Sequence, residues 1–388
     1  MPYDVVNADE ACALAGDNPL SFLRVSRAEL ELPPGTDPYA DAVYGRAAAN
    51  FERLKASSLV VEAEPSVYFY RLSVDGYEQT GVAACWALDD YDRGVIKKHE
   101  RTRPDKEDDR TRHMIALGAQ TGPVFLTYRA TADVKVIGRR VAEDEPLCDF
   151  VAPDQVRHTI WQVGGADRDS LVEGFGRIPA LYIADGHHRA ASAARTRDAF
   201  RDRGVTRPSL GDGADYNTFL AVAFPHDEVR VLPYNRTVKD LGRLTSDAFL
   251  RAVRDRFELG TGPAVPVRSG DLSMYFAGGW HTLRARSRPD AWSAIGSLDV
   301  SVLQDQLLSP VLGITDVTTD KRIDFVGGAH GTTGLERLVQ SGKAAMAFSL
   351  YPVSVADLMA VCDAGAIMPP KSTWFEPKLR DGLLIHLI

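Results

Sequence analysis

The stretch LYIADGHHRAASAA, residues Leu181–Ala194, decides the fold of this 388-residue chain. The apolar run Leu181–Ala184 predicts a buried strand. Gly186 permits a tight turn with a positive φ, and the alanine-rich segment Ala190–Arg203 predicts a helix. A strand that passes through a glycine turn into a helix is typical of anion sites, because the helix N-terminus presents N–H groups and the positive end of a dipole.

The polar residues of this turn suit phosphate. His187, His188 and Arg189 are hydrogen-bond donors, and arginine binds phosphate oxygens in bidentate geometry. Asp185, at the end of the strand, could hold Mg²⁺. Two other interpretations stay open. Asp185 could be an ordinary helix cap beside partly buried histidines, or the histidines could bind zinc, although adjacent histidines do not share a helix face.

Strands and helices alternate irregularly along the rest of the chain, which predicts a mixed α/β or α+β fold. Further strands are expected at 21–25, 66–72, 82–88, 122–128, 134–137, 156–163, 218–224, 274–276, 280–284 and 344–350. Further helices are expected at 8–14, 41–59, 300–312 and 355–364. The segment Gly260–Pro266 is the best candidate for a linker.

The bulk composition excludes several classes of function. Hydrophobic residues make up 45% of the chain, which is enough for a core, and the net charge of -8 disfavours non-specific binding to nucleic acid. Cys12, Cys85, Cys148 and Cys362 show neither zinc nor disulfide spacing. The sequence has no signal peptide and no apolar run that could span a bilayer. We therefore expect a cytoplasmic protein without membrane or nucleic-acid partners; the oligomeric state is left open.

The segment Asp185-Gly186-His187-His188-Arg189 after an apolar strand resembles the free serine kinases of the ParB/sulfiredoxin-like superfamily. The resemblance implies a nucleotide-binding core of that type within residues 1–225, with additional α/β elements in residues 226–388. It also implies that Gly186–Arg189 bind nucleotide phosphates and that Asp185 and His187 are catalytic. Sulfiredoxins carry a cysteine in this turn, so a histidine there argues against sulfinic-acid repair.

Two more segments carry the resemblance. The charged stretch 97–112 alone indicates a solvated loop and the start of a helix. Its His99-Glu100 pair is similar to a pair in the serine kinases, which implies that Glu100 is the base and that His99 adjoins the nucleotide or the base. The segment Met368–Lys378 alone indicates a proline-rich loop. Its likeness to a Pro-Lys-Thr-Thr segment implies that Lys371, Ser372 and Thr373 return to the site and contact phosphate.

The chain also looks like a large family of uncharacterised bacterial proteins of similar length. The shared segments are Pro2–Val6, Asn18–Phe22, Val156–His158 and Leu298–Val300. Members of that family carry a short stretch before the Pro-Tyr-Asp segment. This sequence lacks it, so we expect either a missing first strand or a misplaced start.

The resemblance implies a phosphotransferase that uses ATP or ADP and Mg²⁺. The acceptor would be the hydroxyl of a free amino acid, with L-serine giving O-phosphoserine. Arg157 and Arg236 are candidates for binding the carboxylate of that amino acid. A nucleotide-binding regulator and a nucleotide hydrolase are the alternative functions. Acceleration of nucleotide turnover by serine would distinguish a kinase from both.

Overall fold

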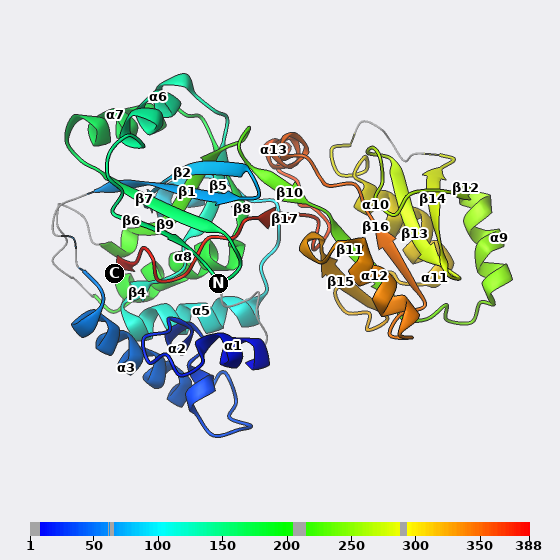
Figure 1. The fold of residues 1–388 in the computed structure, drawn as a ribbon, viewed down its shortest axis with the longest axis horizontal. Helices are drawn as coiled ribbons and strands as arrows, with labels where there is room; N and C mark the ends of the chain where they lie inside the picture. The colour runs from blue at the N-terminus through cyan, green and yellow to red at the C-terminus, as the bar shows by residue number, and fades with distance from the viewer. Residues whose placement is uncertain (1–7, 61, 63–65, 205–214, 288–292) are drawn as a thin grey trace. The chain divides into compact units, whose positions relative to one another are not determined.

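The computed structural model describes residues 8–60, 62, 66–204, 215–287 and 293–388. The fold is mixed α/β and divides into two compact units (Figure 1). Unit 1 contains residues 1–98, 102–229 and 377–388, and unit 2 contains residues 99–101 and 230–376. The chain therefore leaves unit 1, builds most of unit 2 and comes back to unit 1 for its final segment.

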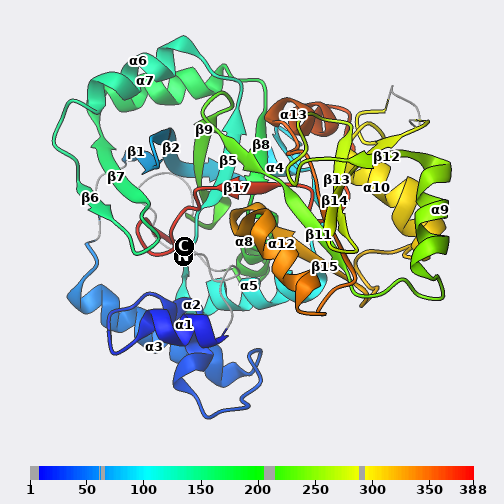
Figure 2. The ribbon, with the colours of Figure 1, turned by 45° about the vertical axis from the view of Figure 1, so that its right-hand side comes forward.

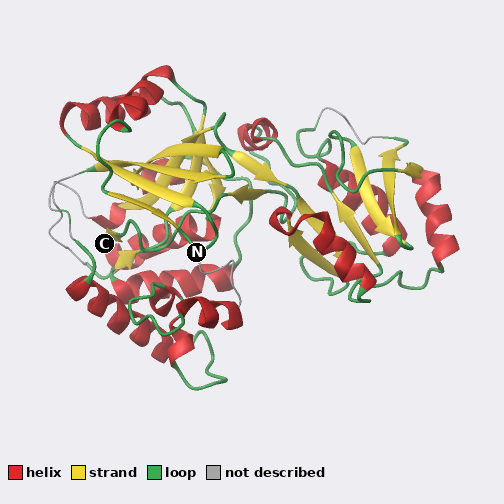
Figure 3. Cartoon of the chain, viewed as in Figure 1, coloured by secondary structure: helices red, strands yellow, loops and turns green. Residues whose placement is uncertain are grey.

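Unit 1 is built on an eight-stranded mixed sheet, drawn in yellow in Figure 3. Its order is β3 (Ile96–Lys97), β8 (Leu181–Asp185), β5 (Val124–Tyr128), β9 (Thr218–Pro225), β2 (Tyr77–Ala87), β1 (Val67–Val74), β7 (Arg157–Val163) and β6 (Cys148–Val151). β8 is parallel to β3 and antiparallel to β5, and β5 is parallel to β9. The remaining neighbours are antiparallel.

Two helices of unit 1, α5 (Pro104–Leu117) and α8 (His187–Asp202), pack side by side and run in the same direction. Near their starts, the hydroxyl of Ser192 donates to the carbonyl of Glu107 over 3.1 Å. Further along, the hydroxyl of Thr196 lies 3.8 Å from the sulfur of Met114. Because both chains advance together, the two N-termini lie at the same end of the pair.

The other helices of unit 1 form two groups. One group, α1 (Ala8–Ala15), α2 (Leu23–Ser26), η1 (Ala28–Glu31) and α3 (Asp41–Ser57), lies beside α5 (Figure 2). The other contains α6 (Ala132–Val141) and α7 (Gly165–Gly176). The shorter helices are α4 (Leu88–Asp92) and η2 (Asp215–Asn217). Apolar residues of the sheet, α6 and α8 share one core, and a second core joins α3 to the end of α5 through Phe51, Leu54 and Leu117.

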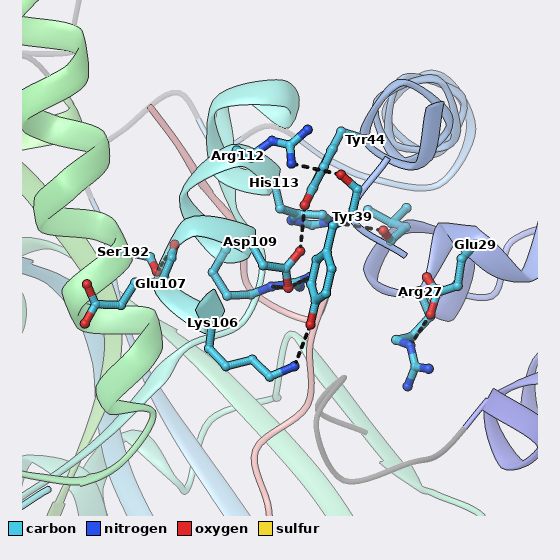
Figure 4. A network of polar contacts seen from close by, with 12 residues as sticks. Arg27, Glu29, Tyr39, Tyr44, Lys106, Glu107, Asp109, Arg112, His113 and Ser192 are labelled. Carbon is cyan, nitrogen blue, oxygen red and sulfur yellow. Dashed lines mark hydrogen bonds and ion pairs between the residues drawn. The ribbon is translucent and has the colours of Figure 1, made fainter. Parts of the chain in front are cut away.

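Polar contacts connect α5 to the segments around it (Figure 4). The hydroxyl of Tyr44 in α3 donates to Asp109 over 2.9 Å, and Arg110 pairs with the same carboxylate at 2.7 Å. Nε2 of His113 lies 3.0 Å from the carbonyl of Val25. Since His113 is buried, this contact fixes the ring as a neutral donor to that carbonyl.

Unit 2 contains a six-stranded antiparallel sheet. Its order is β12 (Phe257–Thr261), β14 (Gly279–Ala285), β13 (Asp271–Phe276), β16 (Met346–Ser349), β11 (Tyr234–Val238) and β15 (Ile323–Gly327). The helices are α9 (Ser246–Arg256), α10 (Asp299–Leu303), a π-helix (Gln304–Leu308), α11 (Ser309–Leu312), η4 (Gly328–His330), α12 (Gly331–Gln340) and α13 (Val355–Asp363). A separate ribbon pairs β10 (Arg230–Leu232) with β17 (Trp374–Glu376).

The last residues of the chain complete unit 1. β18 (His386–Leu387) pairs with β4 (Ala119–Gln120), which directly follows α5. The N–H of Gly382 donates to the carbonyl of Thr121 over 2.8 Å. The N–H of Ile388 donates to the carbonyl of Gly118 over 2.9 Å, and Ile388 is buried. Residues 377–388 therefore form an ordered strap across unit 1.

The predicted strand–turn–helix at 181–203 is confirmed, but three other predictions are wrong. Residues 134–137 belong to helix α6, because Val134, Ile137 and Val141 bury one helical face. Residues 21–25 form a turn and the start of α2, where the N–H of Val25 bonds back to the carbonyl of Phe22. Residues 260–266 begin inside strand β12 and do not link the two units. The segment Pro2–Val6 lies outside the described residues.

The buried His113 gives a pH-dependent stability. Burial first, and then the charge of Arg110, lower its pKa from 6.5 to about 4. Below the pKa that His113 has in the unfolded chain, the unfolded chain binds a proton and the folded chain does not. The contribution of His113 to the free energy of unfolding is therefore fully present above about pH 6.5 and is lost as the pH falls toward 4. Because of His113, the free energy of unfolding should fall by about 2 kcal/mol between pH 7 and pH 5.

Urea unfolding of the wild-type protein and His113→Gln at both pH values measures this effect. The glutamine keeps a donor for the carbonyl of Val25 but does not titrate, so the variant should lose less stability between pH 7 and pH 5. An identical loss in both proteins would contradict the assignment.

Candidate functional site

The candidate site is the turn between β8 and α8 in unit 1. Strand β8 lies inside the sheet, and Leu181–Ala184 are buried. Gly186 follows with φ +94°, a left-handed conformation that disfavours a side chain. The N–H of Ala190 then donates to the carbonyl of Gly186 over 3.0 Å, which closes the first turn of α8. The amides of His187, His188 and Arg189 are thereby placed at the positive end of a 16-residue helix.

A second helix N-terminus lies at the same place. The N–H of Arg103, the residue before α5, donates to Nε2 of His188 over 3.0 Å. Because Nε2 accepts, the neutral imidazole of His188 carries its proton on Nδ1. The side chain of His188 thus ties the starts of α5 and α8 together. The positive ends of two parallel helices meet at this turn, which favours a bound anion.

Three charged side chains surround the turn. Nζ of Lys378, in the strap, lies 3.1 Å from Oδ2 of Asp185, and Nη2 of Arg189 lies 3.6 Å from the same oxygen. Burial alone would raise the pKa of Asp185. The charges of Lys378, Arg189 and His187 outweigh that effect and hold the pKa of this carboxyl well below its usual range. Asp185 is therefore a carboxylate shared by two cations.

Arg189 is held tightly by its surroundings. Its side chain is buried, and it donates to the carbonyl of Pro123 as well as approaching Asp185. It also folds back over Gly186, where an added Cβ would lie 2.9 Å from Nε of the arginine. Glycine is therefore favoured at position 186 for two reasons. The backbone has a positive φ, and a side chain would collide with Arg189.

Several other predicted residues lie around one loop of unit 2. The loop runs from Met368 to Thr373, and the carbonyl of His99 accepts a hydrogen bond from the N–H of Met368 over 2.8 Å. Nε2 of His99 lies 3.4 Å from the hydroxyl of Thr373. The hydroxyl of Ser372 bonds within the loop, to the carbonyl of Pro369. His99, Ser372 and Thr373 are thus brought together, and Glu100 belongs to the same unit.

Arg236 contacts this loop through its guanidinium group. Its guanidinium is buried, donates to the carbonyls of Tyr234 and Pro370 at 2.5 and 3.2 Å, and lies 4.6 Å from the ring centroid of Phe325. Burial lowers its pKa to about 9. Lys371, which follows Pro370 in the loop, has a φ of +58°, and its Nζ lies over the ring of Tyr234. Among the described residues, no carboxylate pairs with Arg236.

The remaining candidate, Arg157, lies elsewhere in unit 1. It is on β7 and pairs with Asp149 of the neighbouring strand β6 through two hydrogen bonds. Both residues are on the outer strands of the sheet, away from β8 in the strand order. The structure therefore does not place Arg157 at the turn that contains Asp185.

Sequence reasoning missed Lys378 and the polar network next to it. Nε of Arg380 donates to Nε2 of His158 over 3.0 Å, and Nδ1 of that ring lies 2.8 Å from the hydroxyl of Tyr70. Burial and then the charge of Arg380 lower the pKa of His158 to about 4. Arg380 also pairs with Asp154 at 3.0 Å, beside a hollow of about 170 Å³. The sequence did carry one signal for this network, because His158 belongs to Val156–His158, a segment shared with the family of uncharacterised bacterial proteins.

Comparison with known proteins places the chain in a family. Residues 1–301 match a family model described as "Protein of unknown function (DUF1015)", and this match covers more than half of the chain. The chain belongs to this family. No curated protein matches the DUF1015 chain. Among its described helices, none has the length and apolar character needed to cross a membrane.

Solved structures with a similar arrangement share little sequence with the chain. A free serine kinase in complex with AMP is 13% identical, with 78% of this chain and 91% of that chain covered and a TM-score of 0.37. SbnI with a C-terminal truncation, from Staphylococcus aureus, is 11% identical, with 79% and 87% covered and a TM-score of 0.43. A conserved hypothetical protein from Pyrococcus furiosus is 14% identical, with 78% and 93% covered and a TM-score of 0.36.

The turn predicts a strong and specific effect of one methyl group. Gly186→Ala should lower the free energy of unfolding by about 1–3 kcal/mol, because alanine is strained at this φ and its Cβ displaces Arg189. Gly45→Ala is the matched control. Gly45 lies inside α3 with open space around it, so alanine there should raise stability by about 0.5–1 kcal/mol. If Gly186→Ala and the wild-type protein had equal free energies of unfolding in urea, glycine would not be required at position 186.

Proposed function

We propose that the protein is a phosphotransferase that moves a phosphoryl group from a nucleotide to the hydroxyl of a free amino acid, L-serine first. One observation carries the proposal: the N-termini of α5 and α8 meet at the turn where Lys378 and Arg189 flank Asp185. Helix dipoles and fixed cations at one place favour a bound phosphate. The resemblance of Asp185–Arg189 to the free serine kinases supports the same assignment.

In the proposed reaction, the turn holds the phosphates of ATP or ADP. Gly186 allows the backbone to approach them, and the amides of His187, His188 and Arg189 are the donors. Serine Oγ attacks the terminal phosphorus and gives its proton to a carboxylate, for which Glu100 is our candidate. The bond from phosphorus to the bridging oxygen breaks, and the nucleotide leaves with one phosphate fewer. Catalysis of this kind depends on positioning and electrostatics.

The loop Met368–Thr373 supplies the remaining proposed contacts. Lys371 would offset charge on the transferred group, and Ser372 or Thr373 would donate to it. His99 and Arg236 hold this loop through their bonds to it, so we assign them positioning roles. The role of Arg157 as a ligand for the carboxylate of the substrate has less support, since its guanidinium is paired with Asp149.

Mg²⁺ accompanies nucleotides in many phosphotransferases and prefers carboxylate and water oxygens. Asp185 is the carboxylate of the turn, but its Oδ2 already serves Lys378 and Arg189. Two cations beside one carboxylate repel a third, divalent one. Asp185 therefore does not fit the role of a magnesium ligand.

A direct assay tests the proposed reaction. The protein is incubated with ATP or ADP and a panel of hydroxy amino acids, and the products are identified by mass spectrometry. O-phosphoserine formed only with nucleotide and protein present supports the kinase. Nucleotide turnover that serine does not accelerate identifies a hydrolase instead, and binding without turnover identifies a regulator. Either of these results would reject phosphotransfer to serine.

The proposed base gives a sharp prediction. Glu100→Gln keeps the size of the side chain but cannot accept the proton, and general-base catalysis contributes about 10²–10⁴-fold. The variant should bind nucleotide near wild-type affinity and phosphorylate serine at least about a hundredfold more slowly.

The control for this prediction is Glu145→Gln, at an exposed glutamate of unit 1. It should leave both nucleotide affinity and serine phosphorylation unchanged. Full activity in Glu100→Gln would exclude Glu100 as the base, and loss of nucleotide binding would indicate a structural role for it.

A further inference from the structure

We infer that the hollow beside Arg380 in unit 1 binds a small free amino acid, with the carboxylate of the ligand at Arg380 and its ammonium at Asp154. The hollow has a volume of about 170 Å³. A cavity of ~150 Å³ holds benzene, and a small amino acid is of similar size. The inference is independent of the proposed phosphotransfer, because it requires neither a nucleotide nor a reaction.

The guanidinium of Arg380 is held in place at Nε and Nη2. Nε donates to Nε2 of His158 over 3.0 Å, and Nη2 donates to Oδ2 of Asp154 over 3.0 Å. Within the part of the chain that the structure describes, Nη1 has no hydrogen-bond partner. The side chain is 18% exposed, so it is partly shielded from water. A fixed guanidinium that keeps a donor in reserve binds a carboxylate with little loss of freedom.

Two other groups of the lining complete the contacts of an amino acid. Ser21 lines the hollow, and its hydroxyl makes no hydrogen bond to any described residue, so it can donate to the carboxylate of the ligand. Asp154 accepts from Arg380 at Oδ2 and from the N–H of Val156 at Oδ1 over 3.3 Å. Because each carboxylate oxygen has two lone pairs, Oδ1 can also accept from an ammonium group.

The charges around the hollow favour a zwitterion over a simple acid. Arg380 and Asp154 balance each other, and His158 is neutral because burial and then the charge of Arg380 lower its pKa to about 4. A ligand with a carboxylate alone would therefore add negative charge that nothing compensates. The other charged residue among the described lining is Asp381, and a second carboxylate increases this effect. A ligand that also carries an ammonium group keeps the balance.

The rest of the lining restricts the side chain of the ligand. It is apolar and consists of Leu14 in α1, Phe22 and Leu23 around the start of α2, and Pro153. A small apolar side chain is removed from water by contact with these groups. L-alanine meets both requirements. It also has no hydroxyl group, so it cannot accept a phosphoryl group in the proposed reaction.

The first test titrates the full chain, without nucleotide, with L-alanine, propionate and L-alaninamide in a calorimeter. L-alanine should bind, and the other two should bind at least about tenfold more weakly, since propionate lacks the ammonium and the amide lacks the carboxylate. Equal affinity for propionate and L-alanine would identify a site for simple acids. Either that result or a failure of L-alanine to bind would overturn the inference.

A bulky side chain shows whether binding takes place in the hollow. Leu14→Trp should occupy the space of the ligand and weaken L-alanine binding about tenfold or more. The matched control is Val136→Trp on α6, because Leu14 and Val136 are 48% and 49% exposed. This control should leave the affinity unchanged.

Two further variants remove the proposed donors. Arg380→Gln should weaken L-alanine binding about tenfold or more, the scale of a lost charge-assisted hydrogen bond. Its control, Arg177→Gln, removes exposed ion pairs of unit 1 and should have no effect. Ser21→Ala leaves the bonds of Arg380 in place and should weaken binding by a smaller factor.

Urea unfolding of each variant accompanies the titrations. If Arg380→Gln proves unfolded, Leu14→Trp and Ser21→Ala decide the question. Wild-type affinity in both of these variants would show that L-alanine binds elsewhere, which would overturn the inference. Absence of serine phosphorylation would reject the kinase and leave this site in place, because the binding of L-alanine needs no reaction.

Discussion

The carboxylate of Asp185 is the constraint on which unit 1 depends. It lies at the end of β8, before the left-handed glycine, and it balances a lysine from the strap and an arginine from the first turn of α8. Without this carboxylate, two cations would face each other beside two helix N-termini, at a cost that grows with burial. Strand β8 of the sheet ends at Asp185, and α8 and the strap each place a cation beside its carboxylate.

Local sequence was enough to predict the turn itself. Leu181–Ala184 is a short apolar run, Gly186 punctuates it, and alanines follow, so each residue prefers the structure that it adopts. The same reasoning failed for Val134–Ile137, where a short apolar run fits a strand and a buried helical face equally well. Its neighbours in α6 extend the helix, and they decide the outcome through tertiary packing.

The chemistry of the site was less predictable than its backbone. The residue types of Asp185–Arg189 pointed to an anion site, but Lys378 lies 193 positions from its partner Asp185. No periodicity or spacing connects residues that far apart. The parallel packing of α5 and α8, which brings a second dipole to the turn, is likewise a property of the fold and leaves no mark in a local segment. Arg236 shows the converse: the sequence made it a candidate ligand for the substrate, and in the structure its guanidinium is buried and bonds to the loop at Pro370.

The strap also has a consequence for the order of biosynthesis. Residues 230–376 leave the ribosome before residues 377–388, so the sheet of unit 2 can form while unit 1 still lacks β18 and Lys378. Domains generally fold as units during synthesis, the earlier parts first. Until the strap is synthesised, the carboxylate of Asp185 lacks its contact with Lys378 and can keep the one with Arg189. The turn after β8 therefore gains its contact with Lys378 only after the residues of unit 2 have been synthesised.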